Sequence, residues 1–181
     1  MRFLLKATRH ILFFTVIGAF QASVGSLAAE ITDMTVQFAD PVWDGKMIPE
    51  GEHCKKFGGN GSTPPLTVSN IPDGANAIIV EFSDVSYRPM ASGGHGIVGW
   101  RIGNSNEVFL RPIPGGEDEL PQGTWLERKN RATGAWRSPG YLPPCSGGQL
   151  NKYVATIKAV RMNGNDIAEE LAEVDIVMGK Y

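Results

Sequence analysis

The side chains best suited to chemistry in this sequence are two histidines and two cysteines. Of the three histidines, His10 lies in an N-terminal segment that we expect to be removed, so a histidine-dependent site must use His53 or His95. The sequence contains no G-x-S-x-G nucleophile elbow, no H-E-x-x-H zinc motif and no G-x-x-x-x-G-K-[ST] phosphate loop. Because these enzyme templates do not match, we expect no catalytic residues.

His95 is the better candidate because glycines surround it, in the segment 93–96. Backbone N–H groups of a glycine-rich loop can approach a ligand closely. Asp84 lies 11 residues earlier, at the end of the preceding predicted strand, and would meet His95 if the two flanking strands pair. A neighbouring carboxylate favours imidazolium, so the pair would bind a phosphate or carboxylate with help from backbone amides. The alternative is structural, with His95 bonded within its loop and Asp84 capping a turn.

Cys54 and Cys145 are 91 residues apart. In an exported chain two cysteines are candidates for a disulfide. A loop of that length would contribute about 4–5 kcal/mol on the chain-entropy model. Two separate buried thiols are the alternative. We expect no metal site, because neither cysteine belongs to a C-x-x-C pair and His53 is the only adjacent residue of a zinc-ligand type.

The N-terminus has the pattern of a secretory signal peptide. Three basic residues precede an apolar run at 11–20, and a small-x-small cleavage pattern ends at Ala28. The run has about 10 residues, whereas a membrane-spanning helix needs about 20. We therefore predict a signal peptide over 1–28 and a mature domain over 29–181 with no transmembrane segment. An uncleaved N-terminal anchor is the alternative.

The mature chain would be acidic. The whole chain has 17 Lys and Arg against 19 Asp and Glu, and the leader removes three basic residues, which leaves a formal net charge of −5. Nucleic-acid binders and proteins of anionic membrane surfaces usually carry a basic surplus instead. We therefore expect no nucleic-acid partner.

The composition indicates a β-rich domain. The 22 glycines and 12 prolines are nearly a fifth of the 181 residues, against an average of about 12%. So many turn residues favour short strands, while the apolar content of 42% is enough for a core. Alternating or continuous apolar runs predict six strands, at residues 29–39, 66–71, 77–83, 97–102, 153–160 and 174–178.

Three further segments bear on the fold. The nearly continuous apolar run at 77–83 predicts a strand buried on both faces. Asn165 or Asp166 can cap a short helix, since the next apolar residues share one helical face, namely Ile167, Leu171 and Val174. Residues 104–137 show no readable periodicity, although Trp125 and Trp136 within them suit a core cover or a cleft wall.

Several short motifs, which occur in the family's order along the chain, resemble the phosphatidylethanolamine-binding protein family and, within it, the bacterial Raf-kinase-inhibitor-like branch. Asp84 falls where that branch begins its D-P-D-A-P motif, and His95 falls on the histidine that opens the next strand. The other matching segments are Cys54 with Gly59-Asn60 and Thr63-Pro64-Pro65-Leu66, then Ile71-Pro72 with Gly74, Gly140-Tyr141 with Pro143-Pro144-Cys145, Asn151-Lys152-Tyr153-Val154, and 172–181. The resemblance spans nearly all of the mature chain.

The resemblance implies a mainly β fold, in which a large antiparallel sheet packs on a smaller sheet with a short C-terminal helix. It also implies a pocket at one end of the sheet for phosphate-like groups, without a cofactor or catalysis. In that pocket, tyrosine hydroxyls and loop amides are hydrogen-bond donors, His95 is a switchable cation and Asp84 orients it. The residues carried over are Asp84, His95, Tyr141, Pro144 and Tyr153. Cys54 and Cys145 match cysteines of the bacterial branch, which favours their pairing.

The chain departs from the family pattern around this pocket. The D-P-D-A-P motif is reduced to the segment 84–88, and the family's His-Trp pair is His95-Gly96. The H-R-Y motif begins with Asn151-Lys152, so a neutral amide, which carries no charge at any pH, replaces one histidine.

The function expected from the sequence is binding of a small anion, either phosphate or a phospholipid head group, by an exported protein. The leader and the branch together indicate a bacterial protein of the periplasm or one that is secreted. The alternative is a protein-interaction or inhibitor module with a vestigial pocket and a protein partner of its own. A hydrolase that uses His95 is a third interpretation, which a turnover assay on phosphomonoesters would test.

Overall fold

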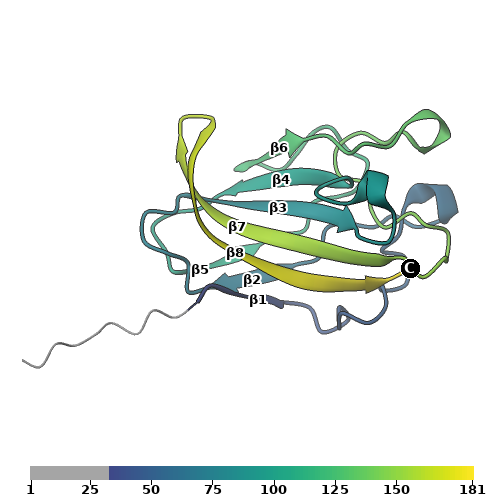
Figure 1. The fold of residues 1–181 in the computed structure, drawn as a ribbon, viewed down its shortest axis with the longest axis horizontal. Helices are drawn as coiled ribbons and strands as arrows, with labels where there is room; N and C mark the ends of the chain where they lie inside the picture. The colour runs from purple at the N-terminus through teal and green to yellow at the C-terminus, as the bar shows by residue number, and fades with distance from the viewer. Residues whose placement is uncertain (1–32) are drawn as a thin grey trace, which may run out of the picture. The chain divides into compact units, whose positions relative to one another are not determined.

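The computed structural model describes residues 33–181 as two antiparallel sheets (Figure 1). The larger sheet has the strand order β6-β4-β3-β7-β8, with bounds Thr124–Arg128, Gly96–Arg101, Ala77–Asp84, Lys152–Asn163 and Asp166–Lys180. The smaller has the order β1-β2-β5, with bounds Thr35–Phe38, Leu66–Ser69 and Glu107–Leu110. Three short 3₁₀ helices lie in loops, namely η1 (Lys55–Phe57), η2 (Arg88–Met90) and η3 (Gly134–Trp136).

The predicted mainly β fold, with a large and a small antiparallel sheet, is confirmed. The predicted signal peptide, 1–28, lies outside the described residues. Within 33–181, no helix has the length and apolar character needed to cross a membrane.

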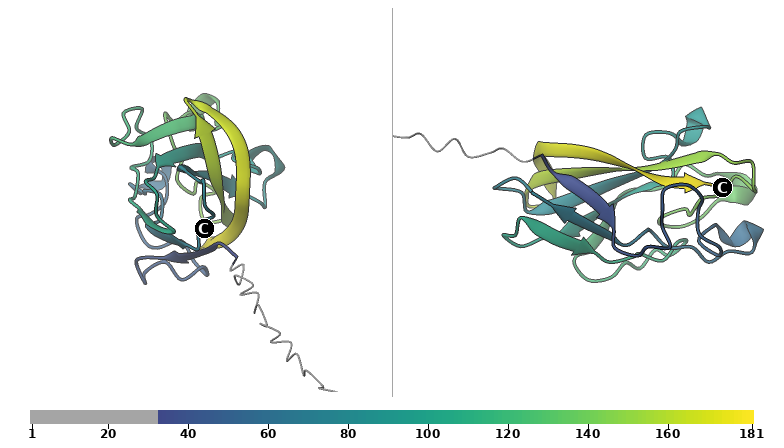
Figure 2. Two further views of the ribbon diagram at one scale, coloured as in Figure 1. Left: turned by 90° about the vertical axis from the view of Figure 1, so that its left-hand side faces the viewer. Right: turned by 90° about the horizontal axis from the view of Figure 1, so that it is seen from below.

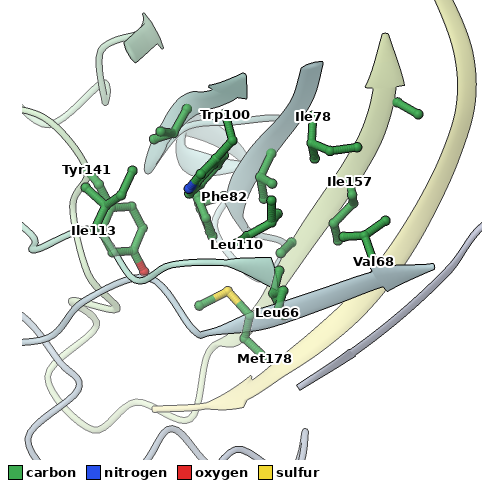
Figure 3. Packing of buried hydrophobic residues seen from close by; sticks show 14 of the residues in the cluster. Leu66, Val68, Ile78, Phe82, Trp100, Leu110, Ile113, Tyr141, Ile157 and Met178 are labelled. Atoms are coloured by element: carbon green, nitrogen blue, oxygen red, sulfur yellow. The ribbon is translucent and has the colours of Figure 1, made fainter. Parts of the chain in front are cut away.

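The core lies between the two sheets, which face each other in Figure 2. Leu66, Val68 and Leu110 of the smaller sheet are buried in the same cluster as residues from the larger one (Figure 3). The facing residues include Ile78, Val80, Phe82, Val98 and Ile157. Burying such side chains stabilises the fold by about 1.5–3 kcal/mol each.

Strand β3 is buried on both faces, which confirms the prediction from its continuous apolar run. Its inner face joins the main core, whereas Ala77 and Ile79 belong to a second cluster on the outer face. The Trp125 ring packs against that cluster and lies over Gly99, where an added Cβ would come within 2.2 Å of the ring. This part of the outer face is therefore buried without a covering helix.

The predicted short C-terminal helix is wrong, because residues 166–180 form β8 instead. Pairing with β7 satisfies the backbone groups that β7 would otherwise leave at an open edge. Cross-strand ion pairs add to the pairing, since Lys158 contacts Glu170 and Glu173 at 3.1 and 3.0 Å. The apolar residues that predicted the helix are spaced three and four positions apart, as on one face of a helix. The segment nevertheless lies along the edge of β7 and pairs with it as a strand.

Most of the other strand predictions agree with the structure, although within the described part of the first predicted strand, 29–39, only β1 (35–38) is a strand. Strands β2, β3, β4 and β7 lie where the apolar runs predicted them, and the final predicted strand is part of β8. The stretch 104–137, in which no periodicity was readable, contains β5 and β6. Both are short and lie at sheet edges, so burial leaves little pattern in their sequences.

Cys54 and Cys145 form a disulfide, with their Cα atoms 5.2 Å apart. It joins the loop that leads into η1 to the β6–β7 connection, and the Cys54 N–H also donates to the Pro144 carbonyl at 3.0 Å. The predicted pairing is confirmed, and the alternative of separate thiols is excluded.

Removing this cross-link will destabilise the protein. Replacing both cysteines by serine should lower the free energy of unfolding by about 2–5 kcal/mol, because the unfolded chain regains the freedom of a 91-residue loop. Chemical denaturation of the oxidised wild type and the double variant measures this difference. A reductant should affect only the wild type. Two reactive thiols in the denatured oxidised wild type would contradict the pairing.

Candidate ligand-binding site

A cavity of about 410 Å³ lies at the end of the larger sheet where β3 ends. The loops after β3 and β6 reach this end, and the C-terminus lies there too (Figure 1). Three of the predicted site residues line the cavity, namely Asp84, His95 and Tyr153. Other polar or aromatic lining residues are Tyr87, Arg131, Trp136, Ser146 and Asn151.

Strand pairing brings the three predicted residues together. Asp84 is the last residue of β3 and lies opposite Tyr153 of β7. The backbone N–H of His95 donates to the carbonyl of Phe82 in β3 at 2.9 Å, immediately before β4 begins. All three residues therefore lie within one or two positions of the same end of neighbouring strands.

The buried Asp84 carboxylate is held by three hydrogen bonds. Its Oδ1 accepts the backbone N–H groups of Ser86 at 2.9 Å and Tyr87 at 3.1 Å. Its Oδ2 accepts Nδ2 of Asn151 at 2.6 Å. The first two bonds form an Asx turn that fixes the start of the β3–β4 loop. Asn151, at the position where the family has histidine, holds the remaining carboxylate oxygen.

The His95 ring is fixed by the Leu142 carbonyl, which accepts a hydrogen bond from Nδ1 at 2.8 Å. A carbonyl can only accept, so Nδ1 carries the proton. Nε2 has no hydrogen-bond partner within residues 33–181, and the ring lines the cavity. The expectation that Asp84 orients the ring is wrong, because the Asp84 carboxylate bonds Asn151 and its own loop.

Burial lowers the pKa of His95 below its usual value of 6.5. The Leu142 carbonyl and the charge of Asp84 act in the opposite direction, but desolvation is larger. At neutral pH the imidazole is therefore neutral, with Nε2 as an acceptor. A bound anion would shift this balance and favour the imidazolium form.

The ring of Tyr153 lies beside that of His95. The two rings meet edge to face with centroids 5.2 Å apart, and the Tyr153 oxygen accepts the backbone N–H of Cys145 at 3.1 Å. Burial raises the pKa of Tyr153, so its hydroxyl stays protonated at neutral pH. The hydroxyl hydrogen can therefore be donated to a neighbouring acceptor.

The structure does not bring Tyr141 and Pro144 to the cavity. Tyr141 is buried in the core, with its ring 4.6 Å from that of Phe82 (Figure 3). Burial raises the pKa of Tyr141 well above its usual range, and its hydroxyl has no hydrogen-bond partner within residues 33–181. Pro144 instead accepts a hydrogen bond from Cys54 through its carbonyl.

Two lining residues come from the segment that had no readable pattern. Arg131 donates to the carbonyls of Pro89 at 3.1 Å, Ala91 at 2.6 Å and Ser92, so it ties the β3–β4 loop to the β6–β7 connection. Trp136 in η3 provides an aromatic wall, although the family's aromatic position is Gly96 here. No sequence signal distinguished Arg131, since its acceptors are backbone carbonyls some 40 residues away.

Among the described residues, no group of three or more His, Cys, Asp or Glu side chains is placed to hold a metal ion. The groups at the cavity are hydrogen-bond donors and acceptors with one fixed cation, Arg131, and one fixed anion, Asp84. Such a set can bind a small polar molecule and exchange a proton at His95.

The buried hydroxyl of Tyr141 should not stabilise the folded protein, because it has no hydrogen-bond partner within residues 33–181. Replacing Tyr141 by Phe should leave the free energy of unfolding unchanged or raise it by about 1 kcal/mol, because a buried hydroxyl without a partner is lost. Tyr153→Phe is the matched control and should lower it by about 1 kcal/mol, because the Cys145 N–H loses its acceptor. Thermal or chemical denaturation measures both. An equal loss in the two variants would show that Tyr141 has a partner.

The fold of this chain is similar to that of a protein of known structure. No protein-family model and no curated protein sequence matches the chain. A solved structure does match, that of a phosphatidylethanolamine-binding protein homologue from Chlamydia trachomatis, with a TM-score of 0.51 and 19% sequence identity. The match covers 82% of this chain and 97% of that one. The chain therefore has the fold of a phosphatidylethanolamine-binding protein homologue.

Proposed function

We propose that the protein is an exported binding protein whose cavity takes a small anion, either phosphate or a phosphorylated head group. The observation that carries the proposal is the His95 ring, which lines the cavity with an unpartnered Nε2 and packs against the ring of Tyr153, another lining residue. The Tyr153 hydroxyl is a hydrogen-bond donor, and Nε2 becomes a second, charged donor when His95 gains a proton, which suits an oxyanion.

The charges of the cavity favour proton uptake on binding. Arg131 and Asp84 balance each other formally, and His95 is neutral at neutral pH because burial lowers its pKa. An anion beside Nε2 would raise that pKa, so the bound state would hold one more proton. Affinity would therefore increase as the pH falls from the ligand-bound pKa toward the lower pKa of the free protein.

Two further observations support the proposal. The shared fold connects the chain to a protein described as a phosphatidylethanolamine-binding protein homologue. The Cys54–Cys145 disulfide agrees with an oxidising compartment, where such bonds persist. Both suit the exported, Raf-kinase-inhibitor-like type of binding protein, without catalysis, that the sequence motifs resemble.

Calorimetric titration of the mature protein with phosphate and phosphoethanolamine tests this function. We expect binding to the wild type that His95→Asn weakens about tenfold or more, because the variant keeps a donor for the Leu142 carbonyl but lacks Nε2. His53→Asn is the matched control, since His53 does not line this cavity. Phosphate and phosphoethanolamine distinguish a free anion from a head group.

A second titration, with sulfate, separates protein protonation from ligand protonation, because sulfate stays doubly charged over the range used. Between about pH 7.5 and 5.5 the affinity of the wild type should rise by up to about tenfold per unit, whereas His95→Asn should show a flat profile. Absence of binding to the wild type at millimolar phosphate and phosphoethanolamine would contradict the proposal. The protein-interaction or inhibitor module would then be the better interpretation.

A further inference from the structure

A second cavity, of about 420 Å³, shares a wall with the first. Trp136, Leu142 and Cys145 line both. The remaining walls of the second cavity come from the loop around η1, from the two glycines 115–116 and from residues that follow η3. None of the residues predicted from the sequence to bind a ligand lies in it.

This second cavity is cationic. Its lining includes Lys55, Lys56 and Arg137 but no acidic side chain. Lys55 is paired with Glu117, with Nζ to Oε1 at 3.1 Å, at the surface. Within residues 33–181, Arg137 has no ion pair and its side chain no hydrogen bond, and Lys56 Nζ lies 4.3 Å from the ring centroid of Trp136. Two positive charges therefore remain without an acidic partner.

The two cavities differ in their formal charge. There the fixed charges of Arg131 and Asp84 cancel, and His95 is neutral at neutral pH. The second cavity has a formal surplus of two positive charges even when Glu117 is counted, in a chain whose formal net charge is −2. Like charges in one cavity repel each other unless an anion lies between them.

Part of the wall of the second cavity is held by long-range links. The disulfide holds Cys54 to Cys145, and the N–H of Gly115 donates to the carbonyl of Gly61 at 2.9 Å. Gly115 also packs against Pro143, whose ring atoms would lie 2.2 Å from an added Cβ. A fixed wall lowers the entropic cost of binding. Asn60 and Ser138 add neutral polar groups to the lining.

We propose that this second cavity is a binding site for a small dianion, such as an oxyanion or a dicarboxylate, held between Lys56 and Arg137. A dianion suits this cavity because its two negative charges neutralise the surplus of two positive charges in the lining. The site works independently of His95, so its affinity does not change as the histidine titrates. It therefore stands whether or not the first cavity binds phosphate.

The test uses sulfate and succinate as probes at about pH 8, with the His95→Asn variant as the starting protein, so that Nε2 of His95 is absent from the first cavity. We expect sulfate and succinate each to bind with a stoichiometry of one per protein molecule. Replacing both Lys56 and Arg137 by Glu should weaken binding about 10- to 100-fold, since each lost charged contact costs about tenfold. Comparing the two probes shows whether the site prefers a tetrahedral oxyanion or a dicarboxylate.

The matched control is Lys46→Glu with Arg111→Glu, which makes the same change in net charge at exposed positions outside both cavities. It should leave the affinity within about twofold of the starting protein, because distant exposed charges are screened by salt. Equal melting temperatures would show that both double variants are folded. The proposal is overturned if neither probe binds at millimolar concentration, or if the cavity variant binds as tightly as the control.

Discussion

The pairing of β3 with β4 and β7 determines both the core and the position of the first cavity. It places the end of β3 beside the start of both neighbours, so that Asp84, His95 and Tyr153 meet. A slip of one residue in either register would turn every side chain of that strand to the opposite face. The apolar inner faces, with Ile78 and Ile157 in one cluster, prevent such a slip. The core therefore positions the cavity as well as stabilising the sheets.

The two buried polar side chains at this end of the sheet, Asp84 and His95, differ in how many of their polar atoms are hydrogen-bonded. Asp84 is an anion with three hydrogen bonds, so its charge is compensated by groups of the protein. His95 has a bond at Nδ1 only, and desolvation keeps the ring neutral at neutral pH. Both oxygens of the Asp84 carboxylate thus have hydrogen-bond partners within the protein, whereas His95 keeps Nε2 available to a ligand. This asymmetry is what the proposed anion binding uses.

The Cys54–Cys145 disulfide lies where the two cavities adjoin, since Cys145 lines both and Cys54 lines the second. It fixes loops that contribute few backbone ladder bonds of their own. Arg131 acts similarly on the β3–β4 loop through three carbonyls. Both cavities therefore have walls made of irregular loops that long-range links hold in place. Their charges differ because the basic residues of η1 and Arg137 face only the second cavity.

The β class and most strand positions could be predicted from the amino-acid sequence, as could, through the family resemblance, the cysteine pair and three residues that line one cavity. These features depend on local apolar patterns or on motifs whose residues are close in the chain. Three features depend on the folded structure: 166–180 is a strand, Tyr141 lies in the core, and Arg131 and Trp136 line the cavity. Each of these outcomes depends on a partner far away in sequence, such as the edge of β7 or the carbonyls of another loop. A local pattern contains no information on such partners, because they become neighbours only when the sheets have formed.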